Sequence, residues 1–157
     1  MAYQARVLVI ANVTANSPEL IAALQSRQAH GPMVPTLLMP ATKNGYAGRA
    51  EATERMETVL AQWREAGVTA TGVVGDPDPV VAVHETWDPR SYDEVIVSTL
   101  SGQTSKWMQS DLPHRVQQIT GCDVVHVEAG KKQEPHWGPP PERRPPSPFT
   151  LRVPRSH

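Results

Sequence analysis

Residues 6–13 are RVLVIANV, a continuous apolar run rich in β-branched side chains. Such a run is typical of a strand buried on both faces of a parallel sheet, because helices then cover both of its faces. The segment 17–19 (SPE) follows and combines a capping serine, a proline suited to the first helical turn and an early acidic side chain. We therefore predict a buried strand, then a helix that begins after Ser17 and ends near Gly31.

Strand and helix patterns alternate along the rest of the chain. Apolar runs predict further strands at residues 36–39, 69–74, 94–99 and 124–128. Helical spacing of apolar residues predicts helices from Arg49 to about Gly67, from Pro79 behind a capping Asp78, and at residues 111–120. Each connection is long enough for a crossover helix. We therefore predict an α/β fold: an open, parallel, five-stranded, Rossmann-like sheet with helices on both faces.

The carboxyl-terminal segment has a different composition. Of the 16 prolines among 157 residues, eight lie in residues 131–157, which carry six Lys/Arg against two Glu. This composition buries little apolar surface, so we predict one domain at residues 1–130 and a disordered, proline-rich tail at 131–157. The stretch 143–148 (RRPPSP) is similar to a polyproline II ligand, so a protein partner of the tail is one hypothesis and a solvated extension the other.

Charge and cysteine content limit the functional classes. The tail contributes +4, so the net charge of −1 leaves −5 for residues 1–130, which does not favour a nucleic-acid-binding surface. Cys122 is the single cysteine, so neither an intramolecular disulfide nor a multi-cysteine zinc site can form. No apolar run approaches the length of a membrane span, and the first residues lack a signal-peptide pattern. We expect a cytoplasmic protein that binds neither nucleic acid nor membrane.

Four segments resemble the universal stress protein family. They are RVLVIAN at 6–12, GDPDPVVAV at 75–83, YDEVIVST at 92–99 and LPHRVQQITGCDVVHV at 112–127. The resemblance covers about residues 4–129 and implies the strand order 3-2-1-4-5. It also implies a homodimer. The strand predicted at 124–128 favours the same assembly, because an unpaired apolar edge usually has to be covered.

The resemblance implies an ATP or AMP site where the strand order reverses, between the first and fourth strands. Ligands of open α/β sheets bind beside the carboxyl ends of the strands at such a point. The candidate nucleotide-binding residues follow the first, third and fourth strands, and they are Ala11, Asn12, Thr14, Val74, Gly75, Asp76, Ser98, Thr99, Gly102, Ser105, Ser110 and Asp111.

These residues depart from the pattern of ATP-binding members. Residues 12–14 (NVT) lack the carboxylate and the glycine of the family triplet, and the loop 98–106 has one glycine. Phosphate binding requires backbone N–H groups that only small residues leave open. Asp111 is expected to cap the following helix and to repel phosphate there. These departures predict a degraded nucleotide site.

Other motifs point to structure rather than chemistry. His84 begins a zinc-protease-like stretch, but Asp88 stands where the second histidine is required. Ser105 lacks the glycines of a nucleophile elbow. Asp76 suits a turn, and Lys106 is expected to be solvated beside a packed Trp107. We therefore predict no catalytic residue and no metal site.

Three hypotheses follow. The first is a non-enzymatic regulatory or binding domain of the universal stress protein type with a degraded nucleotide site. The second is a functional ATP- or AMP-binding stress-response protein. The third, an α/β enzyme that acts on nucleotides, has little support because no catalytic base is recognisable.

Overall fold

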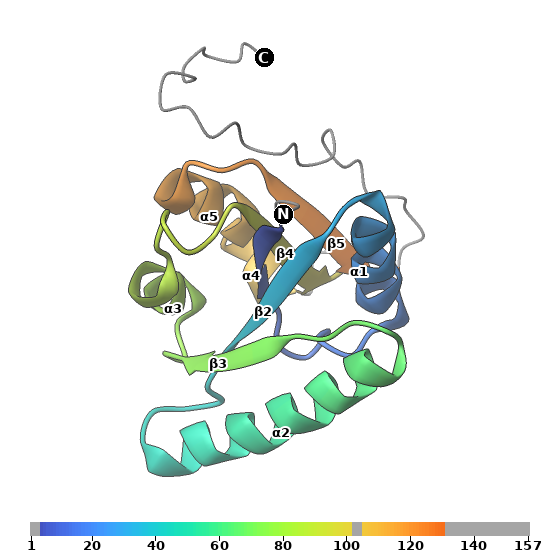
Figure 1. Cartoon of the computed structure of the whole chain (residues 1–157). Helices are drawn as coiled ribbons and strands as arrows, with labels where there is room; N and C mark the ends of the chain where they lie inside the picture. The colour runs from blue at the N-terminus through green and yellow to red at the C-terminus, as the bar shows by residue number, and fades with distance from the viewer. Residues whose placement is uncertain (1–3, 102–104, 131–157) are drawn as a thin grey trace.

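The computed structural model describes residues 4–101 and 105–130 (Figure 1). The predicted tail at 131–157 lies outside the described residues, and so does Gly102. The elements in chain order are β1 (Ala5–Ile10), α1 (Pro18–His30), β2 (Met33–Pro40), α2 (Tyr46–Glu65), β3 (Thr71–Gly75), α3 (Pro79–Thr86), β4 (Glu94–Leu100), α4 (Lys106–Gln109), α5 (Leu112–Thr120) and β5 (Val124–Ala129).

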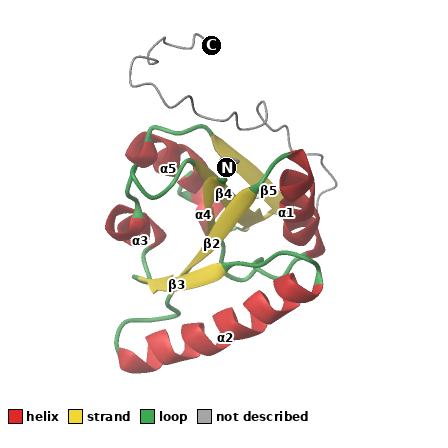
Figure 2. Cartoon of the chain, in the orientation of Figure 1, coloured by secondary structure: helices red, strands yellow, loops and turns green. Residues whose placement is uncertain are grey.

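The five strands form one sheet in the order β3-β2-β1-β4-β5, and every neighbouring pair is parallel. Helices flank the sheet on both sides, as Figure 2 shows. Side chains of α1 and α2 pack in one apolar cluster, and those of α3 and α5 pack in the other. The predicted α/β class and strand order are confirmed. The order reverses between β1 and β4.

The first strand is buried on both faces, as its composition predicts. Val7 and Val9 belong to the cluster under α1 and α2, whereas Leu8 and Ile10 belong to the cluster under α3 and α5. This alternation follows from the two-residue period of a strand. β1 therefore forms the centre of the sheet and fixes the position of the residues that follow it.

Several element bounds differ from the predicted ones. β1 ends at Ile10 rather than Val13, because the chain turns there and the Ala15 N–H donates to the Asn12 carbonyl. β2 begins at Met33, earlier than predicted, and contains Pro35. β3 starts to pair with β2 only at Thr36, so the missing N–H of Pro35 interrupts no bond to β3.

Helix α2 begins at Tyr46, three residues before the predicted start, and runs alongside β3 (Figure 1). The preceding Gly45 has φ 93°, a left-handed conformation that favours glycine. Gly48 lies in the first turn of α2, where a Cβ would overlap the Lys43 carbonyl. The absence of a side chain at this position therefore allows the helix to form there. The sequence pattern predicts the helix only from Arg49, because glycine and polar residues before it are typical of a loop.

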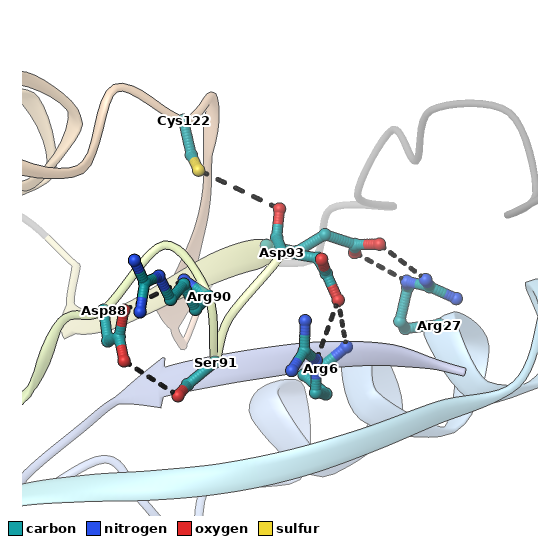
Figure 3. A network of polar contacts seen from close by, with 8 residues as sticks. Arg6, Arg27, Asp88, Arg90, Ser91, Asp93 and Cys122 are labelled. Carbon is teal, nitrogen blue, oxygen red and sulfur yellow. Dashed lines mark hydrogen bonds and ion pairs between the residues drawn. The ribbon is translucent and has the colours of Figure 1, made fainter. Parts of the chain in front are cut away.

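A polar network ties together the amino-terminal ends of β1 and β4 (Figure 3). The Asp93 carboxylate accepts from the Arg6 backbone N–H at 2.9 Å. Arg27 of α1, only 2% exposed, donates to both carboxylate oxygens of Glu94 at 2.9 and 2.7 Å. These groups lie at the amino ends of the strands. The carboxyl ends of the strands, at the opposite edge of the sheet, are therefore open to form a binding site.

No helix in the described part of the chain is long and apolar enough to cross a membrane.

Candidate functional site

A pocket of about 310 Å³ lies at the carboxyl ends of β1 and β4, where the strand order reverses. It is the position at which open α/β sheets bind ligands. Its described lining residues come from the turn after β1, the end of β4 and the start of α4: Asn12, Val13, Thr14, Ser98, Thr99, Leu100, Ser105, Lys106 and Trp107.

Buried hydroxyl groups line the inner part of the pocket. Thr14 Oγ1 and Ser98 Oγ lie 2.6 Å apart and join the ends of β1 and β4. Thr99 Oγ1 lies 2.7 Å from Nε2 of His126 on β5. Ser105 Oγ accepts from the Met108 N–H at 3.2 Å and so caps α4. Each hydroxyl therefore has a fixed position.

Arg55 fixes the Asn12 side chain from outside the pocket. Its Nη1 donates to Asn12 Oδ1 at 3.1 Å across 43 residues of sequence. Arg55 belongs to α2, whereas Asn12 follows β1. The contact orients an amide that lines the pocket and places a guanidinium directly behind it.

The outer part of the pocket combines apolar side chains with one cation. Val13 is 62% exposed and Leu100 is 46% exposed, and both line the pocket. Trp107 is half-buried, packs against the cluster under α3 and α5 and also lines the pocket. Lys106 is exposed. Among the described lining residues Lys106 alone carries a formal charge, so the local field favours an anion.

The structure brings together five of the predicted site residues. Asn12, Thr14, Ser98, Thr99 and Ser105 all line the pocket. Ala11 does not line it, because Ala11 is fully buried and its N–H donates to the Leu38 carbonyl.

The group predicted after the third strand does not line the pocket. β3 is separated from β1 by β2, which places Val74, Gly75 and Asp76 away from the reversal point. Gly75 instead allows α3 to approach the sheet, since a Cβ there would lie 2.7 Å from the Ala82 Cβ. Asp76 Oδ1 accepts from the Asp78 N–H at 2.9 Å, which confirms its role in the turn.

The predicted cap at Asp111 is wrong, and neither Asp111 nor Ser110 lines the pocket. Asp111 has the left-handed values φ 55° and ψ 47°, and its side chain makes no capping hydrogen bond. The short helix α4, which the pattern did not reveal, forces the chain to turn tightly into α5, and the Asp111 N–H donates to the Met108 carbonyl. A capping side chain needs an extended backbone to reach the helix amides. The proposed repulsion of phosphate by a capping carboxylate therefore loses its basis.

Sequence reasoning missed Arg55, His126 and the apolar side chains at the pocket entrance. Arg55 was one of several charged residues in a helical pattern, and nothing local distinguished it. His126 is brought beside Thr99 by the register of β4 and β5, in which Val97 pairs with His126 and Thr99 with Glu128. Only the pairing of strands reveals such contacts.

Two groups with shifted pKa values, the Asp88 carboxyl and the Cys122 thiol, lie outside the pocket lining. The backbone N–H of Arg90 holds the pKa of Asp88 below its ordinary value of 3.8 (Figure 3). Burial raises the pKa of the Cys122 thiol above 9.0. Within residues 4–101 and 105–130, no group of three or more His, Cys, Asp or Glu side chains is arranged to hold a metal ion.

A parallel sheet of this order with a pocket at its reversal point defines a Rossmann-like α/β binding fold. The chain has the fold of the universal stress proteins, which confirms the resemblance read from its motifs at the level of fold. A universal stress protein from Archaeoglobus fulgidus superposes with a TM-score of 0.57 and 13% identity, over 80% of this chain and 99% of that one. A universal stress protein family protein from Arabidopsis thaliana, with AMP bound, has a TM-score of 0.50 and 14% identity, over 80% of this chain and 92% of that one. No protein-family model and no curated protein matches the sequence.

Proposed function

We propose that this chain is a non-enzymatic binding module of the universal stress protein type, which acts in the cytoplasm and holds a small anionic ligand in the pocket between β1 and β4. The observation that carries the proposal is the composition of that pocket. Its described lining offers hydroxyl, amide and ammonium groups and no carboxylate. Donors that converge without a competing negative charge favour an anion.

The volume favours a small ligand. About 310 Å³ is at the lower end of the range for small-molecule pockets. The apolar entrance, formed by Val13, Leu100 and Trp107, suits a ligand with a flat or apolar body. A ligand with one anionic group and one ring system fits both properties.

A nucleoside monophosphate is the more specific candidate. Two observations favour it: the Arabidopsis thaliana neighbour has AMP bound, and Asp111 does not cap α5 in this chain. The NVT sequence after β1 and the scarcity of glycine in the loop after β4 still distinguish this site from the ATP-binding pattern. We therefore expect a monophosphate to bind more tightly than ATP.

An enzymatic role is the competing hypothesis. A hydroxyl 2.7 Å from an imidazole nitrogen, as in Thr99 and His126, is the arrangement of a nucleophile and its base. Thr99 is buried at the junction of β4 and β5, which favours a role in joining the strands. Prolonged incubation with AMP or ATP, followed by chromatography of the products, distinguishes the two roles. Turnover that Thr99→Val abolishes would refute the non-enzymatic proposal.

Native mass spectrometry and calorimetry test the binding proposal. We expect the undenatured chain to bind AMP, and saturating AMP to raise Tm because the ligand binds only the folded state. Ser105→Val and Lys106→Gln should weaken binding, whereas Lys43→Gln, in an exposed loop outside the pocket, should not. Failure of AMP, ATP and inorganic phosphate to bind would refute an anion site in this pocket.

A further inference from the structure

The orientation of the Asn12 amide is determined by the chemistry of its partner. A guanidinium group donates hydrogen bonds and cannot accept them. The Asn12 atom 3.1 Å from Arg55 Nη1 is Oδ1, and the opposite orientation would place two donors against each other. Arg55 therefore fixes which end of the amide is the acceptor.

The donor end of the amide remains for the pocket. Asn12 lines the pocket and Arg55 does not, so the oxygen is engaged from outside the lining. The Asn12 Nδ2 has no hydrogen-bond partner among residues 4–101 and 105–130, and the side chain is half-buried. A half-buried NH₂ group at the edge of a pocket requires an acceptor, which a ligand can supply.

The pocket thus has two different ends. On the β4 side lies the Lys106 ammonium, together with the Ser105 hydroxyl, whose oxygen accepts from Met108 and whose proton remains able to donate. On the β1 side lies the Asn12 amide with Arg55 behind it. The ammonium suits the phosphate of a nucleotide, and the amide at the other side of the pocket suits its base.

We infer that the Asn12 amide, oriented by Arg55, selects a ligand group that accepts hydrogen bonds, so that a base with a ring carbonyl binds better than adenine. This inference rests on the proposed function, with a nucleoside monophosphate as the ligand. The 6-oxo group of hypoxanthine or guanine accepts, whereas the 6-amino group of adenine donates. An adenine amino group facing the Asn12 NH₂ would leave two donors without acceptors.

IMP and AMP are a matched pair of probes, since both have the same ribose and phosphate. Their bases differ at the 6-position and at the neighbouring N1, which donates in IMP and accepts in AMP. Calorimetric titration of the full chain should show IMP binding roughly tenfold more tightly than AMP, because the AMP complex would leave two donors unpaired at a half-buried position. Asn12→Asp presents only acceptor oxygens and remains beside Arg55. It should therefore reverse the preference towards AMP.

Two further variants separate specificity from general weakening. Arg55→Gln can donate or accept, so the Asn12 amide is free to rotate and the ratio of IMP to AMP affinity should fall towards one. Lys106→Gln should lower both affinities and leave their ratio unchanged. Circular dichroism and Tm of each variant establish that it is folded.

The outcomes distinguish this inference from the proposed function. If AMP binds wild type as tightly as IMP or more tightly, the inferred preference for a ring carbonyl is wrong. The proposed anion-binding function of the pocket would then still be supported. An unchanged ratio in folded Asn12→Asp overturns the role of Asn12 in the same way. If wild type binds neither nucleotide, both the nucleoside monophosphate candidate and the inference are overturned.

Discussion

Thr14 Oγ1 and Ser98 Oγ form a buried hydrogen bond of 2.6 Å between residues 84 positions apart in the sequence. Thr14 follows β1 and Ser98 lies in the buried part of β4, and the sheet order reverses between these two strands. This bond joins two buried residues from the two sides of the pocket. Its loss should affect both the stability of the fold and the shape of the site.

Removing one of these hydroxyls should destabilise the fold. Thr14→Val keeps the shape of the side chain but leaves the Ser98 hydroxyl buried without that partner, at a cost of about 1–3 kcal/mol. Thr14→Val with Ser98→Ala should cost less than the sum of the single changes, because neither unpaired hydroxyl then remains. Urea denaturation measures these free energies. Thr53→Val, on the exposed side of α2, is the control, and strictly additive losses would contradict the coupling.

Asp111→Gly should stabilise the protein, whereas a capping role would predict a loss. Asp111 is exposed and has φ 55°, a conformation that costs an ordinary residue energy and costs glycine little. The expected gain is a few tenths of a kcal/mol up to about 1 kcal/mol, reduced because aspartate tolerates this region better than most residues. Asp111→Val should have the opposite effect. Thermal unfolding of both variants shows whether each substitution raises or lowers the stability. A loss of stability in Asp111→Gly would support a capping role for Asp111.

The Cys122 thiol should react slowly at neutral pH. Burial raises its pKa above 9.0, and its Sγ lies 3.8 Å from the Asp93 carbonyl oxygen (Figure 3). The folded state favours the neutral thiol over the thiolate. The stability that this preference contributes is present below the unfolded pKa and is lost as pH rises through the folded pKa. Alkylation followed by mass spectrometry should be much slower for folded than for urea-unfolded protein at pH 7.5. Equal rates would mean an exposed thiolate.

Truncation after Gly130 should leave the domain folded. Residues 131–157 contain eight prolines and six Lys/Arg, a composition with little apolar surface to bury. We expect Tm of the truncated chain to lie within a few degrees of the full chain. Differential scanning calorimetry of both chains makes the comparison. A fall of many degrees would place the tail against the domain through Trp137, Phe149 or Leu151.

We predict a homodimer through the outer edge of β5. Among residues 4–101 and 105–130, the backbone of β5 pairs with β4 on one side only, and an open edge strand favours pairing with a second copy. Two side chains of this strand are candidates for the joint surface, Val125 and Val127. Val127 is 2% exposed and packs under α1 and α2, so its side chain cannot contribute. Sedimentation equilibrium should therefore test Val125→Asp, which is half-buried on the same strand.

The opposite edge of the sheet provides the matched control for this experiment. Val73→Asp on β3, at a partly exposed position, should leave the dimer intact. A monomeric wild type would contradict the dimer. A folded Val125→Asp variant that remains a dimer would move the interface away from β5.

The fold class, the order of the elements other than the short helix α4, and the caps at Ser17 and Asp78 could all be predicted from the sequence. Ser17 accepts from the Leu20 N–H and Asp78 from the Val80 N–H, as the local pattern indicates. Such signals are local, because apolar periodicity and capping involve residues within a few positions of each other. The strand order and the general place of the site followed from the family resemblance, and the structure has the same order.

Tertiary structure decided which of the predicted residues line the pocket and which further residues join them. Asn12 meets Arg55 across 43 positions, and Thr99 meets His126 across 27, because helix packing and strand register bring them together. The tight junction between α4 and α5 gives Asp111 a left-handed backbone, which no neighbouring residue in the sequence predicts. The sequence by itself therefore determined the scaffold through local periodicity. Contacts between distant elements decided which groups of the pocket donate hydrogen bonds and which accept them, since each depends on a partner that only folding brings close.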